Sequence, residues 1–271
     1  MAVDLPSLTA DLLAETDVTV RMLDPLSAAD WDRPTPSPGW TIRDQVTHLA
    51  YFDDAAAMAV TDPARFRVEA DELMALGDHF PDHVAARFRH LPGSETLDWF
   101  RAARTRLLAT VAGADPRLRL PWYGPPMSLA SAVTARLMET WAHGQDIADA
   151  VGVTREPTAR LRHVAHLGVG TFAFTHALHG VDTPTAPVRV DLRAPDGDRW
   201  TWGPPDAADR VTGTALDFCL VVTQRRHLDD TALQVTGRTA RAWLVIAQAY
   251  AGRAGEGRAP RQPGPSAGAG S

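Results

Sequence analysis

The sequence predicts a mainly α-helical protein, an antiparallel four-helix bundle followed by a small α+β domain. The first half contains four long segments with helical apolar spacing and no strand pattern between them. The second half alternates apolar and polar residues on both sides of a turn, which is typical of a β-hairpin. We therefore expect a bundle over 1–153, an α+β domain over 154–251 and a disordered tail over 252–271.

The bundle helices follow from apolar periodicity and from capping residues. The first predicted helix is Leu5–Leu23, and Thr41 is a plausible N-cap of a second helix that runs to about Val60. A third long helix extends from Ser94 through Val111, and Ser128 caps a fourth that ends near Gly152. A shorter helix is expected near 64–76, before Gly77 and Pro81.

The second half mixes helices with short strands. Val188, Val190 and Leu192 alternate with polar residues, and a Pro-Asp-Gly turn separates them from Trp200 and Trp202. Helices are expected over 157–180, 214–226 and 239–250, with a short strand over 232–235. The tail is rich in Gly, Pro, Ala and Arg and has no apolar periodicity, so we expect it to be disordered.

Composition excludes several functions. The chain has 271 residues and a net charge of −6, which argues against a nucleic-acid partner. Every basic residue is arginine, so Schiff-base chemistry and a P-loop lysine are excluded. Cys219 is the single cysteine and lies in an apolar run, which favours a reducing cytoplasm and a buried, unreactive thiol. No apolar stretch reaches the roughly 18 residues of a membrane span.

The fourth helix carries an unusual polar stripe. At about 100° per residue, Arg136, Glu139, His143 and Asp146 fall within about 80° of one another and border the apolar face. Burying a carboxylate and an imidazole without partners costs several kcal/mol. The carboxylate of Glu139 and the imidazole of His143 must therefore interact with a metal ion, with each other or with Arg136.

The second helix carries a histidine on its inward face. His48 shares that face with Gln45 and Phe52. Together with Glu139 and His143 it makes a two-nitrogen, one-oxygen set that suits Zn²⁺ with an open position, or Fe, Ni or Mn. The alternative is an ordinary Glu139–His143 ion pair beside a hydrogen-bonded core histidine. The remaining histidines are interpreted as surface or loop residues.

Several segments together resemble a known superfamily. Residues 38–49 (PGWTIRDQVTHL) and 139–146 (ETWAHGQD) are similar to the two metal-binding motifs of the DinB-like and mycothiol-dependent maleylpyruvate isomerase superfamily. Residues 217–227 and 247–252 resemble its C-terminal domain. Residues 121–128 and 162–168 are similar to an actinobacterial branch described only as metal-binding. The resemblance covers about 5–252.

The resemblance implies a DinB-like bundle that holds a metal through His48, Glu139 and His143. It also implies a catalytic arginine in the C-terminal domain, for which Arg225 occupies the matching place. Gln224 stands where the family usually has glycine, and Arg226 follows, so the choice between the two arginines stays open. Arg226 is then a substrate-binding candidate. Trp122 and Tyr123 are expected either to line the cleft or to pack.

The resemblance implies an enzyme that uses mycothiol as an external thiol cofactor. A metal-activated thiol that adds to a conjugated double bond permits rotation about it, giving isomerisation, or stays attached, giving thiol transfer. Arg225 or Arg226 would bind a substrate carboxylate. The alternatives are a metal-dependent hydrolase or lyase without a thiol, and a non-catalytic metal-containing protein that binds small molecules. We expect a cytoplasmic monomer or homodimer that acts on a small molecule.

Overall fold

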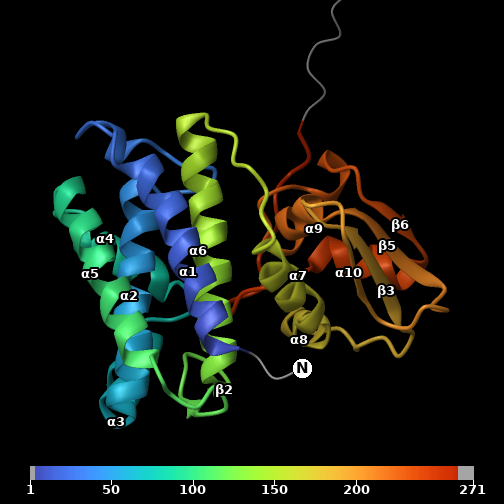
Figure 1. Cartoon of the computed structure of the whole chain (residues 1–271), viewed down its shortest axis with the longest axis horizontal. Helices are drawn as coiled ribbons and strands as arrows, with labels where there is room; N and C mark the ends of the chain where they lie inside the picture. Colours follow the sequence, from blue (N-terminus) through green and yellow to red (C-terminus); the bar gives the residue numbers. More distant parts are fainter. Residues whose placement is uncertain (1–3, 262–271) are drawn as a thin grey trace, which may run out of the picture. The chain divides into compact units, whose positions relative to one another are not determined.

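The structure is a computed structural model that describes residues 4–261. It divides into two compact units, one ending at Glu156 and one beginning at Pro157, while Tyr250–Arg253 group with the first. The first unit is the predicted antiparallel four-helix bundle and the second is the predicted small α+β domain (Figure 1). The boundary lies after residue 156, whereas the sequence places it after 153.

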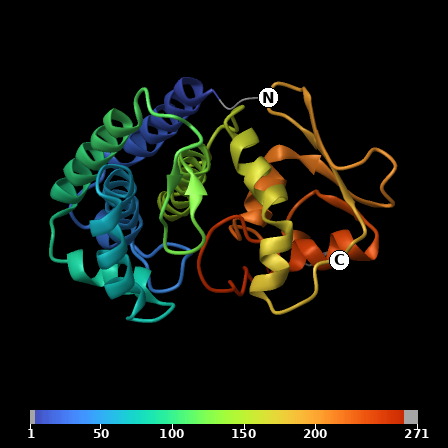
Figure 2. The same ribbon diagram turned by 90° about the horizontal axis from the view of Figure 1, so that it is seen from below.

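Four long helices form the bundle. Its helices are α1 (Leu5–Leu23), α2 (Ile42–Thr61), α5 (Gly93–Val111) and α6 (Leu129–Val151). Helix α2 packs against α5 and α6, and α1 packs against α6 (Figures 1 and 2). All four agree with the predicted helices to within a residue or two.

The apolar faces of these helices form the core between them. Leu23, Leu49, Phe100 and Ile147 each come from a different helix and belong to one buried cluster. Burial of each such side chain stabilises the fold by about 1.5–3 kcal/mol. The sequence therefore positions the helix faces, and with them the polar stripe that borders the core.

Smaller elements complete the first unit. They are η1 (Asp30–Asp32), α3 (Pro63–Met74), α4 (Phe80–Phe88), β1 (Arg119–Leu120) and β2 (Met127–Ser128). Helix α4 was not predicted, because Pro81 was interpreted as a break. In the structure Pro81 lies in the first turn of α4, where no backbone N–H is needed for a helical hydrogen bond. The aromatic loop 121–126 connects β1 to β2, a short antiparallel pair that the sequence did not predict.

The second unit begins with two short helices. The predicted helix over 157–180 is instead α7 (Leu161–Gly170) and α8 (Phe172–Leu178). They are separated at Thr171, which has φ −86° and ψ 8°. Glycine and threonine are poor formers of a helix interior, so Gly170 and Thr171 favour a break at this point.

The second unit contains a four-stranded sheet. The strands are β3 (Val188–Arg193), β4 (Arg199–Trp202), β5 (Asp209–Thr214) and β6 (Gln234–Thr236), in the order β4-β3-β5-β6. The predicted hairpin is confirmed by the antiparallel pairing of Val190 with Trp202. Strand β5, which pairs in parallel with β3, was not predicted. Its sequence DRVTGT contains one fully buried apolar residue, Val211, and therefore shows no apolar alternation.

Two helices contact the sheet, and both end earlier than predicted. They are α9 (Ala215–Val222) and α10 (Arg238–Ile246), with η2 (Leu228–Asp230) between them. The helix expected to reach residue 226 ends before Gln224, whose φ of 59° lies in the left-handed region. An α-helix cannot continue through such a residue.

The predicted disordered tail divides into two parts. Residues 252–261 are described and carry contacts: Arg258 donates through Nε to the Gln224 carbonyl at 3.1 Å, and the Arg261 backbone N–H donates to Asp230 at 3.0 Å. The disorder expected for 262–271 lies outside the described residues. Among the helices of residues 4–261, none combines the length and the apolarity needed to cross a bilayer.

Candidate metal centre

Local interactions fix where helix α2 begins and therefore where His48 points. Thr41 and Asp44 form a capping box in which the Asp44 carboxylate accepts the Thr41 backbone N–H at 2.8 Å. Arg89 also donates to the Asp44 carboxylate at 2.9 Å. This capping confirms the predicted start of α2 and places His48 on the face toward α6.

Helix α6 supplies the other two residues. Ser128 caps it by accepting the Ser131 backbone N–H at 3.1 Å, and Gly152 ends it in a left-handed conformation. Glu139 and His143 lie four residues apart near its middle, so both side chains project from one face. The helix is long and mostly buried, which gives the pair a rigid base.

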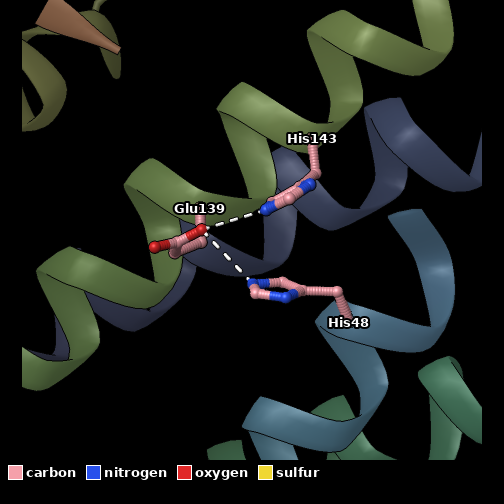
Figure 3. A group of neighbouring side chains, drawn as sticks. All are labelled: His48, Glu139 and His143. Atoms are coloured by element: carbon pink, nitrogen blue, oxygen red, sulfur yellow. Dashed lines mark hydrogen bonds and ion pairs between the residues drawn. The ribbon is translucent and has the colours of Figure 1, made fainter. Parts of the chain in front are cut away.

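The structure brings His48, Glu139 and His143 together (Figure 3). The Glu139 Oε2 atom lies 3.1 Å from His143 Nε2 and 3.5 Å from His48 Nε2. One ligand atom from each residue falls within 4.8 Å of the others. Ligands at about 2.0–2.1 Å in a tetrahedral Zn²⁺ site are separated by about 3.3 Å, so these two distances suit such a site.

The electrostatics of the trio suit a cation. Burial and the neighbouring His143 lower the pKa of His48 to about 4, which favours a neutral imidazole. Burial alone would raise the pKa of Glu139, but hydrogen bonds with His143 and His48 hold it well below its usual value. A carboxylate and neutral imidazoles are ligands that divalent first-row metals accept.

Neighbouring groups surround the two histidines. The Trp40 ring stacks on His143 at 5.8 Å between centroids and tilts against His48 at 5.5 Å. His143 Nδ1 is hydrogen-bonded to Gln45 Oε1. His48 Nδ1 is buried and has no hydrogen-bond partner among residues 4–261.

The other two residues of the polar stripe have different partners. Arg136 donates to Asp53 at 2.9 Å, and Ser37 donates to Asp146 at 3.0 Å. Sequence reasoning left open whether Arg136 would satisfy Glu139, and it did not identify Asp53. The signal was available, because Asp53 lies four residues after Leu49 and seven after Val46, on the apolar face of α2.

Trp122 and Tyr123 lie in an aromatic cluster of the first unit. Trp122 stacks on Phe66 at 5.7 Å, and Tyr123 contacts Phe52 at 5.3 Å. Phe52 in turn contacts His48 at 4.5 Å, so Tyr123 is one ring removed from the trio. A cavity of about 150 Å³ adjoins Tyr123 and is lined by Tyr51, Asp54, Ala55, Met58, Phe66, Glu69, Phe88 and Trp99.

The arginine candidates lie in the second unit, directly after α9. Arg225 is buried and donates through Nη1 to the Thr223 carbonyl at 2.7 Å. Arg226 is half-buried and donates to the Arg225 carbonyl at 2.7 Å. Gln224, which precedes them, has φ 59°, a left-handed conformation that glycine adopts more readily than glutamine.

Two competing residues, Cys219 and His176, belong to the second unit. Cys219 is buried, and burial raises the pKa of its thiol well above the usual value. His176 is buried, which corrects its interpretation as a surface residue; its Nδ1 is hydrogen-bonded to the Phe172 carbonyl at 2.7 Å. Within residues 4–261, His48, Glu139 and His143 are the one group of such side chains close enough to hold a metal ion.

Fold and site together define a four-helix-bundle protein with a candidate metal centre between α2 and α6. Residues 12–148 match the family model described as the mycothiol maleylpyruvate isomerase N-terminal domain, and the chain belongs to that family. Residues 184–236 match a second model, described as wyosine base formation. The predicted superfamily is therefore confirmed.

Relatives and solved structures extend this comparison. Proteins from two strains of Mycobacterium tuberculosis, both named as uncharacterized, are 47 % identical over 249 residues, covering 92 % of this chain and 97 % of each relative. Crystal structures of the mycothiol-dependent maleylpyruvate isomerase, as a histidine-to-alanine mutant and unaltered, match with TM-scores of 0.59 and 0.57. They are 16 % and 15 % identical, and each match covers 88 % of this chain and 94 % of the other, which shows a shared fold.

Proposed function

We propose that this protein is a metal-dependent enzyme that acts on a small, unsaturated, carboxylate-bearing molecule by isomerisation or thiol transfer. One observation carries the proposal: His48, Glu139 and His143 converge from two helices with their ligand atoms within 4.8 Å. Family membership and the fold of the mycothiol-dependent maleylpyruvate isomerase support the reaction class.

The proposed metal ligands are His48 Nε2, Glu139 Oε2 and His143 Nε2. Zn²⁺ is the proposed ion, because a two-histidine, one-carboxylate set leaves a coordination position for substrate. A divalent ion held there would supply the Lewis acidity that lowers the pKa of a neighbouring thiol or water. Trp40 covers the two imidazoles and would limit access of bulk water to them.

The thiol of the proposed reaction comes from outside the chain. Cys219 is buried and its thiol pKa is raised, so it cannot serve as the nucleophile. Mycothiol is the proposed cofactor, and support for it comes from the family and from the named isomerase. A thiol of this kind would supply reversible addition to a conjugated double bond.

Arg225 is the proposed catalytic group of the second unit, and Arg226 the proposed substrate-binding group. A guanidinium can bind a carboxylate through two parallel hydrogen bonds. Lysine cannot reproduce that geometry, so Arg225→Lys should lose turnover and Arg226→Lys should mainly raise KM. Trp122 and Tyr123 are proposed to border the substrate through the aromatic cluster. The cytoplasmic location and the monomeric or homodimeric state stay predictions.

Turnover of maleylpyruvate with and without mycothiol tests the proposal on protein purified without chelator. Thiol-dependent isomerisation that is lost with the metal would support it. Activity that needs the metal but no thiol would replace it with a hydrolase or lyase. Tight binding of the acid with no turnover under any condition would replace it with a non-catalytic metal-containing protein.

A further inference from the structure

A chain of hydrogen bonds runs from the backbone of the loop before α2 to the imidazole of His143. Thr35 Oγ1 lies 2.9 Å from the Trp40 carbonyl oxygen, and Gln45 Nε2 lies 2.8 Å from Thr35 Oγ1. Gln45 Oε1 is hydrogen-bonded to His143 Nδ1. Thr35, Gln45 and His143 therefore form a relay that ends on a fixed peptide group.

The direction of each bond in this relay follows from its fixed end. A carbonyl oxygen is always an acceptor, so the Thr35 hydroxyl donates to Trp40. That hydroxyl has used its one proton, so it accepts from the Gln45 amide N–H. The amide oxygen of Gln45 then faces His143 and can act there as an acceptor and not as a donor.

We propose that Gln45 is a positioning residue that holds the ring proton of His143 on Nδ1 and leaves Nε2 as the ligand atom. This inference deepens the proposed function, because it rests on metal binding at the trio. Gln45 Oε1 faces Nδ1 of His143, and Glu139 Oε2 lies 3.1 Å from its Nε2, so an acceptor is present at each of these ring nitrogens. When a cation occupies the trio, the proton must lie on Nδ1, and the relay already has the matching orientation.

The same loop restrains both helices that build the site. Thr35 contacts Gln45 on α2, and Ser37 Oγ donates to Asp146 on α6 at 3.0 Å. Gln45 is fully buried, so water does not compete for its amide. By contrast, His48 Nδ1 has no such partner among residues 4–261, so the positioning is specific to one of the two imidazoles.

The first test uses metal-free protein labelled with ¹⁵N-histidine. The wild type is expected to show an exchange-protected Nδ1–H resonance for His143, and Gln45→Met is expected to lose it. Gln45→Glu keeps an acceptor beside Nδ1 and should retain the resonance, although it loses the N–H that donates to Thr35. Gln145→Met is the matched control, since Gln145 is a buried glutamine of α6 that donates to Asp149 at 2.9 Å.

The second test is Zn²⁺ affinity measured by competition with a chromophoric chelator. Loss of a partner that orients a metal-bound histidine weakens binding about 10–100-fold, so Gln45→Met should fall in that range while Gln145→Met stays near wild type. Thr35→Val provides a second variant, with a smaller loss expected because Gln45 remains.

The outcomes separate the two proposals. Absence of the Nδ1–H resonance in the wild type, or its survival in Gln45→Met, overturns the positioning role whatever the metal affinity. If no variant and no wild-type protein binds Zn²⁺, the proposed function fails, and a Gln45-dependent Nδ1–H signal would still establish the relay. If Gln45→Met and Gln145→Met bind Zn²⁺ with equal affinity, the proposed effect of Gln45 on metal binding is overturned.

Discussion

Arg136 of α6 donates through Nε to the Asp53 carboxylate of α2 at 2.9 Å, with both side chains buried. Arg104 of α5 donates to the second oxygen of the same carboxylate at 2.7 Å. Arg104 also donates to Thr140 of α6 at 2.9 Å and to Thr16 of α1. This network joins all four bundle helices. It lies close to the candidate metal centre, because Arg136 precedes Glu139 by three residues on α6.

Removal of the central carboxylate should destabilise the bundle strongly. Asp53→Ala leaves two buried guanidinium groups without their partner, and breaking a buried pair in this way costs about 3–5 kcal/mol. Urea denaturation followed by circular dichroism measures the change. Asp98→Ala is the control, because the exposed Asp98–Arg101 pair is expected to contribute at most about 1 kcal/mol. Similar losses for both variants would contradict the central role of Asp53.

Each ligand variant should lose the metal. His48→Ala and His143→Ala remove one of three donors, so the wild type should hold about one equivalent and each variant much less. Elemental analysis of protein purified without chelator checks this. His166→Ala, an exposed histidine of α7, should keep the metal. If both His48→Ala and His143→Ala retained one full equivalent of metal, the two histidines would be rejected as metal ligands.

Metal removal should lower thermal stability in a site-dependent way. An ion present at 100 times its Kd stabilises the folded state by about 2.7 kcal/mol, so a chelator should lower the Tm of the wild type by several degrees. Glu139→Gln should show little response to the chelator, because its neutral amide is a poor metal ligand. A differential scanning measurement in which both proteins respond equally would argue against binding at the trio.

The thiol of Cys219 should be inert in the folded protein. It is buried on α9, and burial raises its pKa, so little thiolate exists at neutral pH. Alkylation by iodoacetamide, followed by mass spectrometry, should be slow in buffer and rapid in denaturant. Rapid labelling of the native protein would contradict the buried position.

The left-handed backbone at Gln224 should tolerate glycine and reject a β-branched residue. A left-handed conformation costs an ordinary residue roughly 1–2 kcal/mol, and β-branched side chains are the least compatible with it. Gln224→Gly should therefore be well tolerated, whereas Gln224→Val should be clearly less stable than Gln224→Gly. Denaturation midpoints of the two variants check the order.

The sequence by itself determined the helices and the candidates. Apolar spacing, the Thr41 and Ser128 caps and Gly152 are local signals, and they predicted the four long helices closely. The spacing of Glu139 and His143 placed both on one face of α6, because residues four apart are neighbours on a helix surface. The hairpin of β3 and β4 was likewise encoded by alternation around a turn.

Only the tertiary structure decided which of these groups meet. The distance from His48 to Glu139 depends on how α2 and α6 pack, and the Thr35–Gln45–His143 relay crosses from a loop through one helix to another. Strand β5 acquires its conformation by parallel pairing with β3, and Asp53 acquires its partners from two other helices. Local periodicity fixes which face of an element is buried, whereas a contact between elements depends on packing distance and rotation, which no single segment encodes.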